Sequence, residues 1–328
     1  MSRIFSNITE LIGKTPLVRL NRLEKEYGLN AEIVVKLEFF NPTQNVKERI
    51  ALSMVEGAEE RGDLKPGGTI IDLSSGNTSI SLAAVAAAKG YKFHAYLQDS
   101  ASNENKQILK AFGADYETIF TNPRLFELVA EYGGDAMKAF GKLLEEGSVA
   151  LNAFATNQME SLDNPKAHYR TTGPEIWEDT DGKIDFFVTG AGTGGTILGA
   201  GGYLKEKNPE IQIVAYQPGV NSRPFENQAP EQPELLGVHP ISGVPFIAPL
   251  LRDKGKLWDE LIDVEAPDAY DAARAAAKHE GILVGESSGA ALYTAIQLAK
   301  RPENAGKRIV ALLADSGVHY LSTPLFEL

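Results

Sequence analysis

Cysteine is absent from this sequence of 328 residues. The chain therefore has no disulfide bond, no thiolate nucleophile and no thiolate ligand for a metal ion. Its five histidines are scattered without the spacing of metal ligands: His94, His168, His239, His279 and His319. We therefore expect no metal site.

Long hydrophobic runs and excess positive charge are also lacking. No apolar stretch approaches the roughly 18 residues that a membrane-spanning helix needs, and the first residues lack the pattern of a signal peptide. The chain carries 32 Lys and Arg against 44 Asp and Glu, a net charge of −12. Such acidity disfavours nucleic acid and anionic membranes as partners. We predict a cytoplasmic protein that acts on a small soluble substrate.

Strand-like and helix-like segments alternate along the chain, whose length suggests two lobes at roughly 100–200 residues per domain. Apolar runs typical of buried strands lie at residues 33–37, 68–72, 92–98, 116–120, 184–189, 211–216, 261–264 and 308–314. Helical patterns lie at residues 46–61, 80–89, 103–112, 122–146, 164–177, 266–279 and 290–300. The alternation predicts an α/β fold of parallel sheets flanked by helices. We predict lobes at residues 1–156 and 157–328, with segment 13–34 a candidate for packing on the other lobe.

A glycine-rich turn, GAGTGGT at residues 190–196, follows the apolar run 184–189 and precedes a helical segment. Four glycines in its first six residues leave the backbone open, so that consecutive N–H groups can converge on an anion at a helix start. Thr193 and Thr196 add hydroxyl donors. Tight helix–strand packing alone would explain the glycines less well, and the pattern predicts a phosphate-binding turn.

The identity of the phosphate compound is constrained by the residues that follow. The turn satisfies G-x-G-x-x-G, the fingerprint of dinucleotide-binding folds and hence of a nicotinamide oxidoreductase. That fold needs an acidic residue about 20 positions later, but the next strand ends in Gln217 and Pro218. The phosphate loop of nucleotide triphosphatases is also excluded, because Ile8 stands where its first glycine would precede Gly13-Lys14-Thr15.

A second polar turn, LSSGNTS at residues 73–79, links a predicted strand to a predicted helix. Its hydroxyls, amide and free N–H groups suit an anion such as a carboxylate. Taken in isolation, an ordinary Ser or Asn helix cap is the preferred explanation, but the presence of two such turns in one chain weakens it. Lys47 falls in the first turn of the helix at 46–61, an unfavourable place for a cation. Lys47 is therefore either solvated, as periodicity alone favours, or held there for a reason.

Several segments occur in the same order in cysteine synthases: residues 11–18, 41–50, 74–78, 171–177, 192–196, 281–289 and 320–323. Over nearly its whole length the chain resembles the O-acetylserine sulfhydrylase and cystathionine β-synthase group. These are pyridoxal-phosphate enzymes of the two-lobed tryptophan-synthase-β-like fold, also called fold type II. The resemblance implies that pyridoxal 5′-phosphate is the cofactor.

The resemblance also implies roles for individual residues. Lys47 would form the Schiff base with the cofactor and then act as the base at Cα. Other residues implied to bind the cofactor are Asn77 beside the 3′-oxygen, the phosphate-binding residues Gly192, Thr193, Gly194, Gly195 and Thr196, and Ser287 facing the pyridine nitrogen. Residues implied to bind the substrate carboxylate are Ser74, Ser75, Gly76, Thr78 and Asn157.

The implied chemistry is β-replacement. A neutral hydroxyl at Ser287 cannot keep the pyridine ring protonated as a carboxylate would, so loss of a β-leaving group should accompany loss of the α-proton. The resulting α-aminoacrylate would accept a nucleophile at Cβ. With O-acetylserine, or another activated serine, and sulfide the product is cysteine. The resemblance further implies a homodimer, and a serine acetyltransferase is a candidate partner.

Three positions and one segment depart from the pattern expected of a cysteine synthase. Asn45 replaces serine, Ser79 replaces glycine, Asn157 replaces a glutamine, and residues 243–247 replace a glycine-rich stretch near the site entrance. The cofactor residues are thus preserved whereas the substrate residues are altered. Two alternatives follow: an enzyme that uses serine or cysteine itself, for cystathionine synthesis or sulfide release, or a catalytically reduced, cofactor-bearing regulatory partner.

Overall fold

The computed structural model describes residues 4–74, 76–97, 101–223, 233–241, 249–252 and 257–327. The chain forms two compact units, residues 1–12 with 47–164 and residues 13–46 with 165–328. The division follows Asn164 rather than residue 156, and the segment grouped with the second unit extends beyond the predicted 13–34. Ser75 and residues 243–247 lie outside the described residues.

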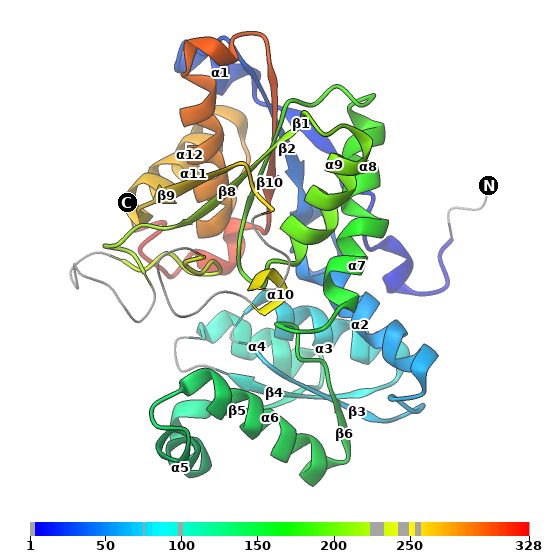
Figure 1. Ribbon diagram of the computed structural model, residues 1–328. Coiled ribbons are helices and arrows are strands. Elements are labelled where there is room, and N and C mark those ends of the chain that lie inside the picture. Colours follow the sequence, from blue (N-terminus) through cyan, green and yellow to red (C-terminus); the bar gives the residue numbers. More distant parts are fainter. Residues whose placement is uncertain are drawn as a thin grey trace. The chain divides into compact units, whose positions relative to one another are not determined.

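A four-stranded parallel sheet forms the centre of the first unit (Figure 1). Its strands are β5 (Asp115–Thr118), β4 (Lys92–Leu97), β3 (Thr69–Leu73) and β6 (Ala153–Ala155), in that spatial order. One face is covered by α2 (Lys47–Arg61), α3 (Asn77–Lys89) and α4 (Asn103–Ala111), and the other by α5 (Pro123–Glu131) and α6 (Ala136–Leu151). Helices on both faces explain why the middle of β3, from Ile70 to Asp72, is buried.

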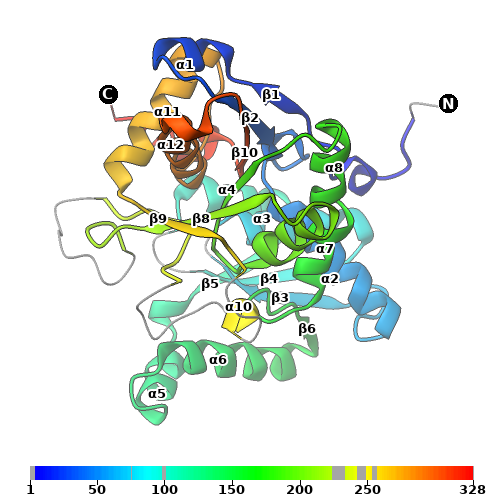
Figure 2. The same cartoon turned by 45° about the horizontal axis from the view of Figure 1, so that its top comes forward.

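The second unit contains a six-stranded sheet in the order β1-β2-β10-β7-β8-β9 (Figure 2). Its strands are β1 (Leu17–Arg19), β2 (Glu32–Leu37), β7 (Phe186–Gly190), β8 (Gln212–Pro218), β9 (Glu260–Val264) and β10 (Arg308–Leu313). Only the β1–β2 pair is antiparallel; β2 and β10 pair in parallel from Glu32–Arg308 to Leu37–Leu313. This pairing explains why residues 13–46 belong to the second unit.

Helices cover both faces of the second sheet (Figure 1). On one side lie α1 (Asn21–Glu26), α11 (Ala266–Glu280) and α12 (Glu286–Ala299), and on the other α8 (Thr172–Asp179), a π-helix (Ile197–Gly201) and α9 (Gly202–Lys207). The remaining helices are α7 (Asp163–Arg170), α10 (Pro249–Arg252) and 3₁₀ turns at Ile8–Leu11, Glu38–Phe40, Ile119–Thr121, Pro302–Asn304 and Gly317–Tyr320. The predicted α/β architecture is therefore confirmed.

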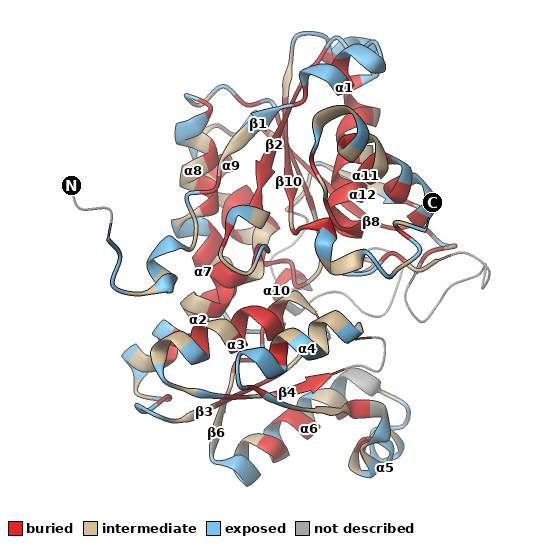
Figure 3. Ribbon diagram, turned by 180° about the vertical axis from the view of Figure 1, so that it is seen from behind, coloured by how far each residue is buried: buried red, intermediate tan, exposed pale blue. Residues whose placement is uncertain are grey.

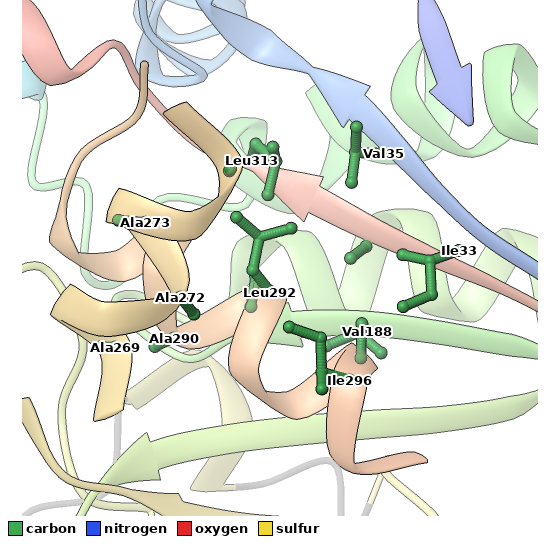
Figure 4. Packing of buried hydrophobic residues seen from close by; sticks show 14 of the residues in the cluster. Ile33, Val35, Val188, Ala269, Ala272, Ala273, Ala290, Leu292, Ile296 and Leu313 are labelled. Atoms are coloured by element: carbon green, nitrogen blue, oxygen red, sulfur yellow. The ribbon is translucent and has the colours of Figure 1, made fainter. Parts of the chain in front are cut away.

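The largest core lies between the second sheet and α12. Figure 4 shows Leu292 of α12 directed toward Leu313 of β10 and Ile296 lying beside Val188 of β7, and all of these side chains are buried. The inner strands β2, β10, β7 and β8 are mostly buried, whereas the outer helix faces are exposed (Figure 3). Among the described residues, no helix is long and apolar enough to cross a membrane.

Helices α11 and α12 approach each other through small residues. Ala269, Ala273 and Ala290 are fully buried, and a Cβ added at Gly289 would collide with the backbone carbonyl oxygen of Ala269. A helical glycine normally costs up to about 1 kcal/mol relative to alanine. Here the glycine is required because the neighbouring backbone leaves no room for a methyl group.

We predict that Gly289→Ala destabilises the protein although alanine is the better helix former, because the methyl group forces α11 and α12 apart. The expected loss is about 1–3 kcal/mol in the free energy of unfolding, measured by urea denaturation. Gly202→Ala is the matched control, since an added Cβ there meets nothing within 4 Å. The control should be neutral or slightly stabilising. Equal stability changes in the two variants would contradict the argument.

Candidate functional site

The turn after β3 carries most of the residues predicted to bind a carboxylate. Helix α3 begins at Asn77 instead of the predicted Ile80, and its N-cap is Gly76, which has no side chain. The predicted Ser or Asn cap is thus wrong for the N-cap position, and no side chain at that position caps the helix start, the end of a helix that suits an anion. Ser79 is fully buried and its hydroxyl donates to the carbonyl of Ser74 at 2.7 Å. Ser79, a departure from the expected glycine, therefore helps to hold the turn.

A buried polar network joins this turn to β3 and β6. The Thr156 hydroxyl donates to Oδ1 of Asp72 at 2.6 Å, and the amide nitrogen of Gln158 donates to Oδ2 at 3.4 Å. The Thr78 hydroxyl donates to the amide oxygen of Gln158 at 2.7 Å. Since β3 and β6 are parallel neighbours, Thr156 and Gln158 emerge at the same sheet edge as the turn. The signal in the sequence was one charged residue, Asp72, within an apolar strand.

Burial dominates the electrostatics of Asp72. Desolvation raises the pKa of this carboxyl group from 3.8 to about 6, while the Thr156 hydroxyl and the backbone N–H groups of Leu73 and Gln158 oppose the rise. A buried carboxylate without a cationic partner is stabilised only by such hydrogen bonds. Asp72 therefore changes its charge within two units of neutral pH.

Asn157 is placed at this edge as well, immediately after β6. Its side chain is exposed, with positive φ of 45°, and the amide donates to Oε2 of Glu160 at 3.0 Å. The neighbouring Gln158 is buried and bonded to Thr78. The side chain that the structure brings to the predicted carboxylate turn is therefore that of Gln158, which the sequence analysis did not single out. The family resemblance pointed to Asn157, and the burial of the neighbouring amide could not be foreseen because β6 was not predicted.

Lys47 is the first residue of α2 and is half-buried. The residues beside it, Val46 and Glu48, are buried. The backbone N–H of Val46 donates to the carbonyl of Ala314 at 2.7 Å, which fixes the chain just before the helix. The interpretation of Lys47 as an ordinary solvated lysine is therefore disfavoured, since such lysines are mostly exposed.

The glycine turn at residues 190–196 follows the carboxyl end of β7, as predicted. Gly194 has φ of +84°, a backbone conformation that favours glycine, and a Cβ there would collide with Leu251. The N–H of Gly195 donates to the Thr193 hydroxyl at 3.3 Å. The groups that residues 190–196 can offer a ligand are backbone N–H groups and two hydroxyls, with no carboxylate among them. This donor set fits a phosphate group.

His168 supports the same turn from helix α7. Its Nε2 lies 3.4 Å from the Thr196 hydroxyl, and its Nδ1 lies 2.9 Å from the hydroxyl of Thr172. The imidazole thus links α7, α8 and the glycine turn. Within the described part of the chain, no group of three or more His, Asp or Glu side chains could hold a metal ion.

Ser287 lies in the first turn of α12, which begins four residues earlier than predicted, at Glu286. The Tyr216 hydroxyl donates to the backbone carbonyl of Ser287 at 2.7 Å. Glu286 is buried and accepts hydrogen bonds from the N–H of Leu236 at 3.1 Å and from the Tyr270 hydroxyl at 3.0 Å. Burial raises the pKa of Glu286 to about 7. Glu286 was not predicted, since sequence alone does not show that its carboxyl group is buried.

Gln217 stands where a dinucleotide-binding fold has its acidic residue, and its side chain connects neighbouring segments by hydrogen bonds. Its amide oxygen accepts the N–H of Ile241 at 2.8 Å and its amide nitrogen donates to Asp263 at 2.7 Å. Nearby, the N–H of His239 donates to the carbonyl of Ala191 in the glycine turn at 2.9 Å. Residues 233–241 therefore contact both the glycine turn and Gln217 near the end of β8, where a dinucleotide-binding fold would carry its acidic residue. This arrangement disfavours the oxidoreductase alternative.

Comparison with known proteins extends these observations. Residues 8–315 match the family described as "Pyridoxal-phosphate dependent enzyme". A cysteine synthase of Staphylococcus aureus (strain N315) is 42% identical over 322 residues, which are 98% of this chain and 97% of that protein.

Solved structures give the same result. The crystal structure of O-ureido-L-serine synthase matches with a TM-score of 0.83 and 36% identity, covering 99% of this chain and 96% of the other. O-acetyl serine sulfhydrylase isoform 3 from Entamoeba histolytica matches with a TM-score of 0.82 and 36% identity, covering 100% of this chain and 93% of the other. The similarity therefore spans both units of the chain.

We predict that Asp72 makes stability depend on pH. Its pKa is higher in the folded state, about 6, than the usual 3.8. The folded protein therefore holds this proton more tightly, and stability is lost as the pH rises through that window. Relative to Asp72→Asn, the wild type should lose up to about 3 kcal/mol of unfolding free energy between pH 3.8 and pH 7.

Urea denaturation of both proteins across this pH range measures the difference. Asp115→Asn is the matched control, because Asp115 is exposed at the start of β5 in the same sheet. The control should follow the wild type at each pH. A constant difference between the wild type and Asp72→Asn would show that Asp72 does not titrate as described.

Proposed function

Since the chain belongs to the family of pyridoxal-phosphate dependent enzymes, we propose that it catalyses β-replacement, making cysteine from O-acetylserine, or another activated serine, and sulfide. The observation that carries this proposal is the 42% identity to a cysteine synthase over 98% of the chain. The similarity to O-acetyl serine sulfhydrylase at a TM-score of 0.82 supports it. The enzyme is thus a transferase that uses pyridoxal phosphate.

The residues proposed to hold the cofactor are those described above. Lys47 would bond covalently to its aldehyde carbon and afterwards carry the proton taken from Cα of the substrate. The turn from Gly192 to Thr196, with Thr193, Gly194 and Gly195, would bind the phosphate, and Asn77 would donate to the 3′-oxygen. When bound, pyridoxal phosphate withdraws electrons from Cα of an attached amino acid.

Ser287 is proposed to contact the pyridine nitrogen. Its hydroxyl carries no charge, and the Tyr216 hydroxyl fixes the backbone at this position. A neutral partner keeps the ring a weaker electron acceptor than a carboxylate would. Removal of the α-proton by Lys47 is then best accompanied by departure of the β-substituent, which agrees with β-replacement.

The substrate carboxylate is proposed to bind at the turn formed by Ser74, Ser75, Gly76 and Thr78. Helix α3 begins directly after Gly76, and this N-cap residue provides no side-chain cap for the helix start. Gln158 is proposed to act here through Thr78, to which it is bonded at 2.7 Å. Asn157, whose amide is engaged by Glu160, is proposed to contribute less than its place in the sequence suggested.

Three further proposals rest on the family resemblance. The enzyme would act in the cytoplasm, form a homodimer and be a candidate partner of a serine acetyltransferase. Light scattering of the purified protein tests the homodimer, and co-purification with a serine acetyltransferase tests that partner. A monomer that makes cysteine would contradict the dimer without affecting the reaction.

We predict that the wild type shows the visible absorbance of bound pyridoxal phosphate and forms cysteine from O-acetylserine and sulfide. Lys47→Ala should lose the lysine-linked absorbance band and at least about 100-fold in turnover, because one amine supplies both the covalent link and the base. Lys92→Ala, at an exposed position at the start of β4, is the control and should match the wild type. Consumption of serine or cysteine, with no reaction of O-acetylserine, would favour the alternative activities instead.

We predict unequal effects for the two adjacent amides after β6. At pH 5.5, Gln158→Ala should raise the KM for O-acetylserine by about tenfold, since it removes the amide that orients Thr78 and one of the hydrogen-bond partners of Asp72. Asn157→Ala should change KM less than about threefold, because its exposed amide contacts only Glu160 among the bonds described. Steady-state kinetics at fixed sulfide checks both. The reverse order of effects would return the substrate role to Asn157.

A further inference from the structure

Asp72 governs the direction of the buried hydrogen bonds that end at the substrate turn. An ionised carboxylate can only accept hydrogen bonds. The amide nitrogen of Gln158 must therefore face Asp72, at 3.4 Å, and the amide oxygen faces the Thr78 hydroxyl, at 2.7 Å. Thr78 has one hydroxyl proton, and this arrangement commits it to Gln158. Toward a ligand, the Thr78 oxygen then presents only lone pairs.

This direction of hydrogen bonding opposes an anionic ligand. A substrate carboxylate is itself an acceptor, so it gains no hydrogen bond from a hydroxyl whose proton is committed elsewhere. A protonated Asp72 would relieve the conflict. Its proton would donate to the amide oxygen of Gln158, the amide would turn over, and its nitrogen would donate to Thr78. The Thr78 hydroxyl proton would then be available to the carboxylate.

We propose that Asp72 is a positioning residue which, through the amide of Gln158, determines whether the Thr78 hydroxyl donates to the bound amino acid. Binding of the anionic substrate is then coupled to uptake of one proton by Asp72 from solvent. No other bond forms or breaks in this step. The inference deepens the proposed function, since it rests on the substrate carboxylate binding at the turn of Thr78.

The surroundings of Asp72 support proton uptake at this position. The carboxyl group is 1% exposed, and burial raises its pKa to about 6. Its partners are neutral: Thr156 on β6 and backbone N–H groups of Leu73 and Gln158. Ala95 is its pair on β4, while His94 and Tyr96 point to the opposite face of the sheet.

Helices α2, α3 and α4 cover the face of the sheet on which the Asp72 side chain lies, and they carry several charged residues. They are Lys47, Glu48, Arg49, Glu56, Glu59, Glu60 and Arg61 of α2, Lys89 of α3, and Glu104, Lys106 and Lys110 of α4. None of them contributes to the pKa shift of Asp72, whose causes are burial and neutral hydrogen bonds. Asp72 should therefore titrate as a single group when the substrate binds.

The test compares KM for O-acetylserine from pH 5.5 to pH 8.5 in the wild type and Asp72→Asn. The asparagine amide nitrogen can donate to the Gln158 oxygen at every pH, so Thr78 remains free to donate. Asp72→Asn should therefore bind the substrate more tightly than the wild type at pH 8.5 and equally well at pH 5.5. The ratio of the two KM values should change by up to about tenfold per pH unit above the pKa of Asp72. The ratio cancels the titration of the substrate amino group, which both proteins share.

Two further variants separate positioning from simple structural damage. Thr156→Val removes a hydroxyl that lowers the pKa of Asp72, so the pH at which KM rises should shift upward without the rise being lost. Asp115→Asn, exposed in the same sheet, should reproduce the wild-type profile. A pH-independent ratio, or weaker substrate binding by Asp72→Asn at every pH, would overturn the proposal.

Calorimetry provides a readout other than turnover. Binding of L-alanine, which has no β-leaving group, is measured at pH 7.5 in two buffers of different ionisation enthalpy. The wild type should take up as much as one proton more than Asp72→Asn. Equal proton uptake would contradict the role of Asp72. A wild type that binds L-alanine with this extra proton but forms no cysteine would contradict the proposed reaction and leave the proton coupling intact.

Discussion

The parallel pairing of β2 with β10 is the constraint on which the chain's organisation depends. Six residue pairs, from Glu32–Arg308 to Leu37–Leu313, join a strand near the beginning of the chain to one near its end. The pairing places β2 in the second unit, although residues 47–164 of the first unit follow it in sequence. The chain passes from one unit to the other between Val46 and Lys47, so the proposed catalytic lysine is the first residue after a fixed backbone position.

Both polar turns use the same feature of parallel sheets. Each follows the carboxyl end of a strand and precedes a helical segment, β3 with α3 and β7 with the π-helix and α9. In such sheets the strand supplies a rigid support and the loop after it supplies the functional groups. The turn after β3 suits a carboxylate because its helix start lacks a side-chain cap. The turn after β7 suits a phosphate because it consists mostly of glycines, together with two threonine hydroxyls.

Much of this arrangement could be predicted, because apolar strands and Gly-rich turns have local signals. The strands β3, β4, β7, β8 and β10 were predicted within a few residues. Helix 122–146 proved to be two helices, since Gly133 and Gly134 adopt positive φ between them. Strand β6 was missed because three residues are too few for a periodic pattern.

The same holds for the candidate site: features set by the local sequence were predicted, whereas features that depend on contacts between distant segments were not. The glycine turn was proposed as a phosphate site from residue types and spacing, whereas the substrate role of the turn after β3 was proposed from the family resemblance. The role of Gln158 was not, because it depends on β6 pairing with β3 and on the burial of Asp72. Glu286 was missed for a similar reason, since its partners Leu236 and Tyr270 are distant in sequence. Hydrogen bonds between distant segments become visible only when the fold is known.

The π-helix at Ile197–Gly201 has a consequence for how this region tolerates changes in length. Gly199 lies within this wider turn, and an added Cβ there would collide with the carbonyl oxygen of Pro165. Each residue of a helix accounts for about 100° of rotation. Removing one residue from this turn would therefore swing α9 by about that angle and carry the fully buried Leu204 out of the core. The π-helix holds one residue more than an α-helical turn would. This extra residue determines the direction in which every later side chain of the helix points.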